Sequence, residues 1–372
     1  MSATATGAGP SVPSNASNGA DPNLGAVAAP RPSPSIVPRG AAGLGLAILV
    51  NANAKRGGRR VAAQIARALP GATVRLTRSA QELDLWLRTA AAPRGILAAG
   101  GDGTAIALVN ALARVTPKSA PLPIAGVLPL GTGNGWAHAL GAPKLHRCLE
   151  LLAQQPGPLP THECGLIEVE NTLTHFAGSG WDAMILEDYK EQLAQAAGPG
   201  RRLSKSVYGY LSATLLRTVP RVAVVGNPNV VVENLGDRVY RINPEGRPEL
   251  VPDAKPGTIL YDGPAGSASV GTCTQFGYRF KAFPFAERMP GFINVRIYAR
   301  GVLAAVSTIP QLWQGAFPVR GMHDWLALSV RMTFSRPVPL QIGGDALGLR
   351  RTVEYHAAPR GVRMVDWRRL SP

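Results

Sequence analysis

Short apolar runs and amphipathic stretches alternate along the first half of the chain. The runs Leu44–Asn51, Ala72–Leu76, Gly95–Ala99 and Ile124–Leu128 are nearly continuous in apolar residues, as is typical of strands buried on both faces. The stretches between them have helical spacing, for example from Gly58 to Leu69. This alternation predicts a doubly wound parallel sheet with ligands at the carboxyl ends of its strands.

The pattern changes after about residue 160. Short β-rich runs, among them Arg221–Val225, Val230–Val232 and Ile293–Ile297, are separated by proline and glycine. Such runs are typical of antiparallel strands. Only residues 186–218 show helical spacing in this half. The second half therefore predicts an all-β antiparallel sandwich that carries one helical insertion.

Two glycine-rich turns follow strands of the first half. Gly100–Thr104 follows Gly95–Ala99, and Pro129–Asn134 follows Ile124–Leu128. One Gly-Gly-Asp-Gly run alone would be an ordinary tight turn, but two such turns at the ends of neighbouring strands indicate a phosphate site. Backbone N–H groups at a strand-to-helix turn bind phosphate, and glycine lets the backbone approach it. Neither turn has the spacing of the dinucleotide fingerprint or of the P-loop.

Asp102 is the acidic residue of the first turn. A carboxylate among phosphate-binding amides would repel a nucleotide unless a cation lay between the two. We therefore expect Asp102 to hold Mg2+, either directly or through water.

Together the two turns resemble the catalytic domain of the diacylglycerol kinase family, which includes bacterial diacylglycerol kinases, sphingosine kinases and ceramide kinases. The resemblance runs from about residue 44 to about residue 366, and several ordered motifs are more specific than one. Further segments resemble family motifs in chain order: Ile48–Asn51 with Gly57–Gly58, Thr77, Ala177–Ala183, Lys205–Leu211 and Gln341–Gly348.

The resemblance implies an ATP-dependent lipid kinase that uses Mg2+ and phosphorylates a lipid hydroxyl of the diacylglycerol, sphingoid or ceramide type. It implies Asp102 and Asp182 as metal residues. It also implies nucleotide contacts by Asn51, Thr77, Gly100, Gly101, Asp102, Gly103, Thr104, Gly131, Thr132, Gly133 and Asn134.

Asp345 is the candidate catalytic base. Aligning Gln341–Ile342 with the strand before the family's Asp-Gly-Glu turn puts Asp345 at the position of the catalytic glutamate. A base there would accept the proton of the lipid hydroxyl. The other interpretation is an aspartate that belongs to a tight Gly-Gly-Asp turn.

Three positions depart from the family pattern. Gly343 replaces the aspartate of the Asp-Gly-Glu turn, Gly135 stands where many members have aspartate, and Pro290 stands where some bacterial members have an aspartate of a structural metal site. These departures leave open a catalytically weak lipid-binding or nucleotide-binding protein. An NAD or sugar kinase also shares Gly-Gly-Asp-Gly, although Pro129–Asn134 resembles the lipid group.

Length and composition suggest the domain boundaries. The 372 residues exceed what one core usually supports. Residues 1–40 are rich in Ala, Gly, Pro, Ser and Asn, which predicts a disordered tail. We expect an α/β ATP-binding domain at 41–160 and a β-sandwich lipid-substrate domain at 161–372. An alternative for the C-terminal segment is that it returns to the first domain.

Charge indicates the partners. The net charge of +16 favours an anionic partner, here an anionic membrane surface next to the lipid substrate, although arginine-rich usage could equally be compositional bias. Nucleic acid is not expected, because no binding motif accompanies the charge.

Three scattered cysteines, and the lack of a signal-peptide pattern or a long apolar run, favour a cytoplasmic protein at the inner face of the membrane. The sequence leaves the oligomeric state unknown.

Overall fold

The computed structural model describes residues 35–36, 45–52, 58–89, 93, 95–131, 134–155, 158–195, 218–220, 222, 226–277 and 280–370. Several features singled out in the sequence lie outside these residues: Gly57, Thr132, Gly133, Lys205–Leu211, and 196–217 of the expected helical insertion.

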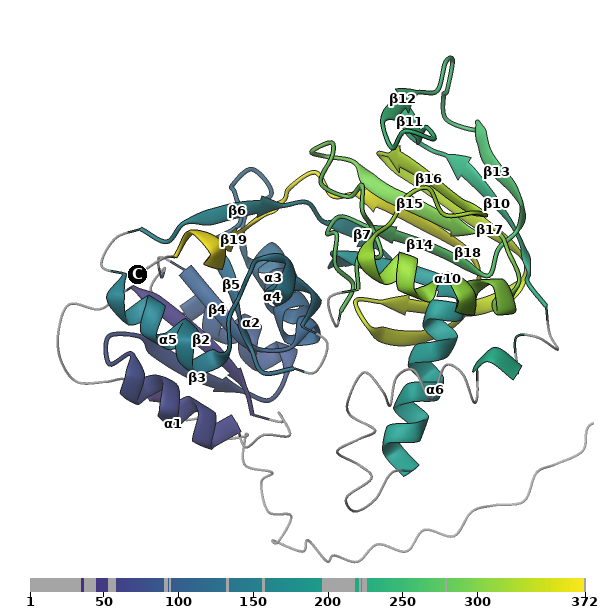
Figure 1. The fold of residues 1–372 in the computed structure, drawn as a ribbon. Coiled ribbons are helices and arrows are strands. Elements are labelled where there is room, and N and C mark those ends of the chain that lie inside the picture. Colours follow the sequence, from purple (N-terminus) through teal and green to yellow (C-terminus); the bar gives the residue numbers. More distant parts are fainter. Residues whose placement is uncertain are drawn as a thin grey trace, which may run out of the picture. The chain divides into compact units, whose positions relative to one another are not determined.

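The first sheet is mostly parallel. Its strands run in the order β1-β3-β2-β4-β5-β19-β6, with β2 to β5 and β19 parallel and β1 and β6 antiparallel at the edges (Figure 1). Strand β19 comes from the C-terminal part of the chain and lies between β5 and β6. The strands are β1 Ser35–Ile36, β2 Leu46–Asn51, β3 Thr73–Thr77, β4 Gly95–Gly100, β5 Ala125–Pro129, β6 Thr161–Cys164 and β19 Val362–Val365.

Helices cover both faces of this sheet. Helices α1 (Gly58–Ala68) and α5 (Leu145–Gln154) pack against each other on one face, and α2 (Ala80–Thr89) and α3 (Asp102–Val115) pack on the other (Figure 1). The short helix α4 (Gly135–Ala139) follows β5. Strand residues such as those of β4 are buried throughout, as the continuous apolar runs require. The predicted doubly wound α/β fold is confirmed.

Helix α2 begins with a capping box. The Ser79 hydroxyl accepts a hydrogen bond from the Glu82 N–H at 3.2 Å, and the Glu82 carboxylate accepts one from the Arg78 N–H at 2.8 Å. The first bond satisfies a donor that the first turn of a helix leaves open, and the second fixes the residue that precedes the cap.

The second sheet is large and antiparallel. Ten of its strands follow the order β12-β11-β16-β15-β14-β9-β17-β18-β7-β8, and β10 joins β17 to β13. The strands are β7 Ile167–Val169, β8 Thr172–Thr174, β9 Phe176–Gly180, β10 Asn229–Asn234, β11 Val239–Ile242, β12 Pro248–Leu250, β13 Ile259–Pro264, β14 Ser267–Gly271, β15 Ile293–Tyr298, β16 Met322–Ala327, β17 Ser329–Ile342 and β18 Asp345–Ala357.

One core lies between parts of this sheet. The first half of β17 pairs with β10, and its last residues pair with β9. Alternate residues such as Val230 and Val232 of β10 pack in the same cluster as Val295 of β15. The predicted all-β antiparallel second half is confirmed.

Two helices of this half lie near the candidate site. They are α6 (Trp181–Gln195) and α10 (Val302–Gln314). The expectation that only 186–218 would be helical is wrong, because α10 is a helix despite containing Pro310. Val222 is helical rather than part of a strand, and 221 and 223–225 lie outside the described residues. A short 3-10 helix, Trp367–Arg369, follows β19.

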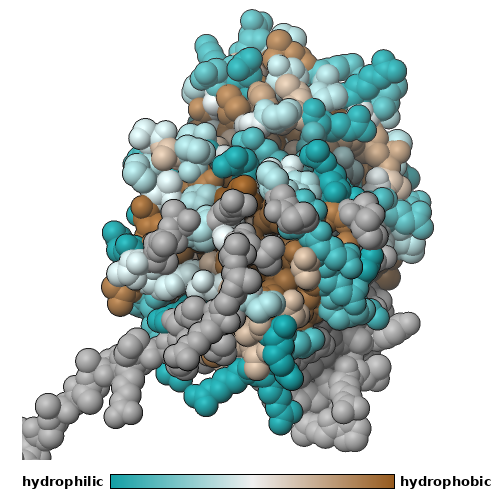
Figure 2. Space-filling model, turned by 90° about the vertical axis from the view of Figure 1, so that its left-hand side faces the viewer, coloured by the Kyte–Doolittle hydropathy of each residue, from teal (hydrophilic) through white to brown (hydrophobic). Residues whose placement is uncertain are grey.

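No described helix combines the length and the hydropathy that a bilayer crossing requires. On the face seen in Figure 2, hydrophilic side chains cover much of the described surface and hydrophobic ones form small groups between them.

Candidate functional site

The ends of four neighbouring strands form the base of the site. In the order β3-β2-β4-β5, Thr77 lies opposite Asn51, and Gly100 lies opposite Pro129. The chain runs from β2 to β3 on one side and continues from β4 to β5 on the other, so β2 and β4 flank a topological switch point, where α/β proteins bind ligands. The structure thus brings Asn51, Thr77 and Gly100 to one edge of the sheet.

The two glycine turns contact each other. The N–H groups of Leu130 and Gly131 both approach the carbonyl oxygen of Gly100, at 2.9 and 3.3 Å. A Cβ atom on Gly131 would lie only 2.6 Å from the Cα atom of Gly101. These glycines are therefore needed for the packing of one turn on the other, in addition to any ligand role.

Gly103 differs from its neighbours. No atom lies within 4 Å of the place where its Cβ would be, so this part of the turn faces open space. Gly103 is also in the first turn of α3, where backbone N–H groups lack carbonyl partners within the helix. The open face of the turn is thus a concavity at a helix N-terminus, an arrangement that suits phosphate oxygens. Thr104, which follows, uses its N–H to donate to the Gly101 carbonyl at 3.0 Å.

Asp102 links the two turns through its carboxylate. One oxygen accepts the Gly135 N–H at 2.8 Å and the other accepts the Trp136 N–H at 2.9 Å, so Asp102 caps the short helix α4. Burial raises the pKa of Asp102, and the hydrogen bonds from Trp136 and Gly135 oppose that rise. This capping role was not foreseen from the sequence, which suggested only a metal.

Asn134 adopts the left-handed conformation, with φ of 50°. Its side-chain Nδ2 donates to the Gly131 carbonyl at 2.8 Å and fixes the second turn. Its Oδ1 is buried and has no hydrogen-bond partner among the described residues. Asn134 also lines a cavity that begins at the turns.

Gly135 is closed to any side chain. A Cβ atom there would lie 2.8 Å from the backbone oxygen of Phe276. The aspartate that many members of the resembled family have at this position would therefore require the segment at Phe276 to move.

Asp345 follows a two-residue hairpin turn. Ile342 and Asp345 pair directly, and Gly343 and Gly344 between them have φ values of 57° and 89°. Both values lie in the left-handed region that such turns require. The Gly344 N–H donates to the Gln341 Oε1 at 3.0 Å. The two glycines line the cavity, while Asp345 itself is exposed next to them.

The hairpin packs against α3. A Cβ atom on Gly343 would overlap the Cδ1 atom of Ile106, and the Gly343 N–H donates to the Phe176 carbonyl at 3.0 Å. The apolar Ile106 thus occupies the space that an aspartate at 343 would need.

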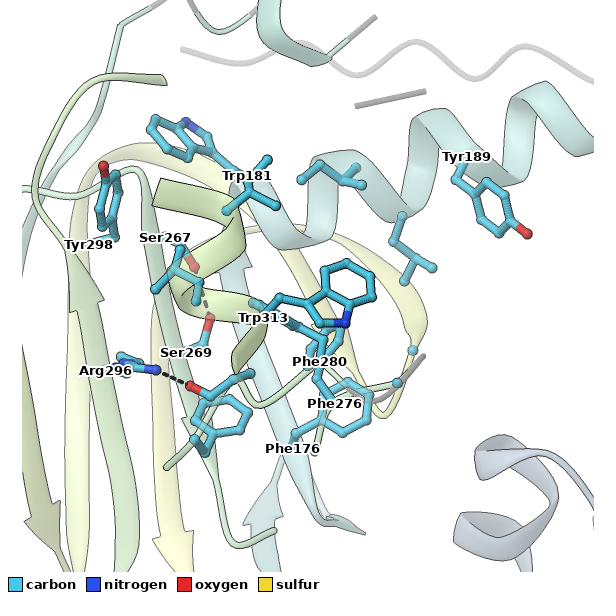
Figure 3. Close-up of a pocket in the computed structure, with 18 of the residues that line it drawn as sticks. Phe176, Trp181, Tyr189, Ser267, Ser269, Phe276, Phe280, Arg296, Tyr298 and Trp313 are labelled. Carbon is cyan, nitrogen blue, oxygen red and sulfur yellow. Dashed lines mark hydrogen bonds between the residues drawn. The ribbon is translucent and has the colours of Figure 1, made fainter. Parts of the chain in front are cut away.

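A cavity of about 490 Å³ extends from the glycine turns over the second sheet. Gly101, Asp102, Gly103 and Asn134 line one part of it, and its remaining lining is mostly apolar. Figure 3 shows aromatic rings from several segments facing this space, among them Phe176, Phe276, Phe280 and Trp313. The apolar lining comes largely from α6 and α10: Trp181, Ile185, Leu186, Val302, Ala305, Val306, Ile309, Leu312 and Trp313.

The described residues include no group of three or more His, Cys, Asp or Glu side chains that could hold a metal ion by themselves. Asp182 is the second residue of α6, and its side chain lies outside the described atoms. The structure therefore does not bring a second described carboxylate to Asp102.

Residues 45–158, which contain both glycine turns, match the sequence profile named diacylglycerol kinase catalytic domain. This segment is therefore similar to the diacylglycerol kinase catalytic domain. It includes the strand ends Asn51 and Thr77 and the Asp102 contact with α4.

Curated relatives match the same part of the chain. The "Eye-specific diacylglycerol kinase" of Drosophila melanogaster is 34% identical over 116 residues, which are 30% of this chain and 7% of that protein. The "Probable lipid kinase YegS-like" of Pseudomonas syringae pv. syringae is 39% identical over 109 residues, which are 29% of this chain and 34% of that protein. The matches thus span about a third or less of these relatives.

A solved structure resembles most of the fold. A crystal structure titled as a diacylglycerol kinase from Bacillus anthracis str. Sterne has a TM-score of 0.56 and 14% identity, and the alignment covers 86% of this chain and 96% of that one. A second structure from this organism gives a TM-score of 0.60 with 14% identity, and covers 86% of this chain and 94% of that one. This likeness includes the large antiparallel sheet as well as the first sheet.

Proposed function

We propose that the protein is an ATP-dependent lipid kinase, which transfers the γ-phosphate of ATP to a lipid hydroxyl of the diacylglycerol, sphingoid or ceramide type. One observation carries the proposal. The same cavity is lined by Gly101, Asp102 and Gly103 of the first glycine turn and by the apolar side chains of α6 and α10. A phosphate-binding turn and a mostly apolar cavity suit a reaction between a nucleotide and a lipid.

The turns fit the phosphates of ATP. The space in front of Gly103 is open, and Gly103 lines the cavity at the N-terminus of α3 together with Gly101 and Asn134. We assign Asn51, Thr77, Gly100 to Thr104 and Gly131 to Asn134 to nucleotide binding, with Thr132 and Gly133 included on the resemblance alone.

The residues fit Mg2+ only in a limited way. Both Asp102 oxygens already accept backbone hydrogen bonds, and no described cluster supplies further carboxylates. An Mg2+ ion that keeps water and nucleotide phosphates as its other ligands needs just one or two carboxylates. Asp102 would supply one and Asp182 is the candidate for the second. The bound ion would neutralise phosphate charge during transfer.

We assign the catalytic base to Asp345. It directly follows Gly343 and Gly344, which line the cavity, and the Gln341 side chain fixes their turn. From this position the carboxylate would accept the proton of a lipid hydroxyl presented at the turn. Phe176 and Phe276, which also line the cavity, would help to exclude water from the reaction.

The protein is proposed to work at the cytoplasmic face of an anionic membrane. The net charge of +16 attracts such a surface. Helix α10, which lines the cavity, has no charged residue, and its Leu303 is 75% exposed. Sedimentation with phosphatidylcholine and phosphatidylglycerol vesicles tests this: binding should prefer the anionic vesicles and weaken in a Leu303→Asp variant. Equal binding to both vesicle types would contradict an electrostatic role.

Transfer of labelled phosphate from ATP tests the function. The acceptors are diacylglycerol, ceramide and sphingosine in mixed micelles, with NAD as the water-soluble comparison. The proposal predicts a labelled lipid and no labelled NAD. A labelled NAD would favour the NAD kinase alternative, and the absence of any labelled product would contradict kinase activity.

A second candidate is a lipid-binding or nucleotide-binding protein of low activity. The observation that favours it is the packing at Gly135 and Gly343, where Phe276 and Ile106 occupy the space of the carboxylates that the resembled family has. Lipid and ATP binding without phosphate transfer would support it.

A further inference from the structure

The floor of the cavity carries polar groups within its otherwise apolar lining. Ile293, Val295 and Ile297 of β15 point into the sheet core, so Arg296 lies on the opposite face, which lines the cavity. Ser269 of β14 lies directly opposite Arg296 in the strand register. The floor therefore has a polar row at the centre of β14 and β15.

The guanidinium group of Arg296 is incompletely paired. The residue is 7% exposed, its Nη1 donates to the Ala282 carbonyl, and its Nε lies 3.1 Å from Asp324 Oδ1. Its Nη2 has no hydrogen-bond partner among the described residues. A buried donor left without a partner destabilises the folded protein. Because Arg296 lines the cavity, a water molecule or a ligand group there would complete this donor.

Further hydroxyl groups lie beside Arg296. The Ser267 and Ser269 hydroxyl oxygens are 3.0 Å apart, and Figure 3 shows them facing each other on the floor with Arg296 next to them. Tyr298 lies opposite Ser267 in the register, and its hydroxyl has no partner among the described residues. The group thus offers several hydrogen-bond donors within a mostly apolar cavity.

The charge of this group is balanced. Asp324 neutralises Arg296, and burial disfavours the charged form of each partner. Among the described lining residues, Arg296 is the one cation and Asp102 the one carboxylate. A charged ligand group would have to lose its hydration here without a free counter-charge, which is costly. A neutral oxygen that accepts hydrogen bonds meets no such penalty.

We infer that Ser267, Ser269 and Arg296 form a specificity subsite that hydrogen-bonds the carbonyl oxygen of an acyl chain of the lipid. The inference rests on the proposed function in that a lipid occupies the cavity. The subsite would favour an ester-linked acyl lipid over the corresponding ether lipid, because the ether lacks the carbonyl and leaves the Nη2 donor of Arg296 without a partner.

Binding of a matched lipid pair tests the subsite. The probes are 1,2-dioleoyl-sn-glycerol and its dialkyl ether analogue 1,2-di-O-oleyl-sn-glycerol in mixed micelles, with the full chain and without nucleotide. One or more hydrogen bonds to the carbonyl should make the ester bind roughly 3-fold to 10-fold more tightly. Equal affinities, or no binding of either lipid, would overturn the inference.

Variants identify the residues responsible. The double variant Ser267→Ala/Ser269→Ala and the variant Arg296→Lys should each reduce the ester preference. Ile309→Ala, on the α10 wall of the same cavity, is the matched control. It should weaken the binding of both lipids by the same factor. Thermal unfolding shows whether each variant is folded. If the Arg296 variant does not fold, the serine double variant alone tests the inference. A full ester preference in the folded serine variant would overturn the inference.

Phosphate transfer is measured separately on the same proteins. Ester-selective binding without any transfer would contradict the proposed kinase activity and support the subsite. Transfer to both lipids with equal binding would support the kinase and overturn the subsite.

Discussion

The carboxylate of Asp102 accepts the backbone N–H of Trp136 at 2.9 Å, so the first glycine turn holds the helix that follows the second. The adjacent N–H, that of Gly135, binds the other carboxylate oxygen at 2.8 Å. Any metal role of Asp102 therefore coexists with a structural one. This relationship changes how variants of Asp102 must be interpreted.

Asp102→Asn should lower both stability and phosphate transfer. An amide presents an NH2 group to one of the two backbone N–H donors, so one hydrogen bond is lost and a buried donor is left without a partner. We expect a loss of about 1–3 kcal/mol in the free energy of unfolding, measured with denaturant. Asp84→Asn is the control, because it removes an exposed ion pair to Arg114 and should cost no more than about 1 kcal/mol.

The metal role is examined by the Mg2+ dependence of ATP binding. If Asp102 contacts the ion directly or through water, the folded Asn variant should need a higher Mg2+ concentration for the same ATP affinity. An unchanged Mg2+ dependence would limit Asp102 to its structural role.

Gly103→Ala should weaken ATP binding without unfolding the protein. Its Cβ would meet no protein atom within 4 Å, and alanine favours the helix by up to about 1 kcal/mol, but the methyl group would occupy the open space assigned to phosphate. Titration with ATP and thermal unfolding measure the two effects. Gly301→Ala, also in open space but at the start of α10, should leave ATP affinity unchanged. An unchanged ATP affinity in the Gly103 variant would show that the phosphates of ATP do not bind in front of Gly103.

His175 should make stability depend on pH. Its ring stacks on Trp136 with centroids 4.3 Å apart, it is fully buried, and neither ring nitrogen has a partner among the described residues. Burial lowers the pKa of His175 to about 3 from its ordinary value near 6.5. Below pH 6.5 the unfolded chain binds a proton that the folded protein excludes, so stability falls as pH decreases.

The size of this effect follows from the linkage slope. Between pH 6.5 and pH 5 the contribution of His175 should decrease by about 2 kcal/mol. A His175→Phe variant keeps an aromatic ring against Trp136 and cannot titrate, so denaturant unfolding of both proteins at each pH isolates the histidine. Parallel pH profiles for the two proteins would show that the pKa of His175 is the same in the folded and the unfolded state.

Local sequence patterns predicted the first sheet well. Strand, turn and helix follow one another within short segments, so Gly95–Gly100, the turn at Asp102 and the capping box of Ser79 with Glu82 could each be recognised from neighbouring residues. The strand ends Asn51 and Thr77 meet because parallel strands share one carboxyl edge.

The cavity floor could not be predicted in the same way. Ser269 and Arg296 meet only through the register of two antiparallel strands, which no local pattern specifies. Helix α10 was missed because Pro310 and β-branched residues lower its helical signal, while Val302 packs against Tyr298 of β15. The position of Phe276 against Gly135 likewise depends on tertiary contacts.

Asp345 provides the sharpest test of the proposed chemistry. The Asp345→Asn variant removes the base and should lower turnover by about 100-fold to 10,000-fold, while ATP binding and stability stay near wild type because the residue is exposed. Asp345→Glu restores the glutamate of the resembled family and should retain activity. Turnover, ATP affinity and thermal unfolding are measured for both.

The pair separates catalysis from turn formation. The turn itself depends on Gly343 and Gly344, whose φ values are positive, and on the Gln341 side chain. An aspartate that only supports such a turn should tolerate asparagine, which makes similar local hydrogen bonds, better than glutamate. An active Asn variant beside an impaired Glu variant would therefore remove Asp345 from the reaction, and the base would have to be sought among the other polar groups of the cavity.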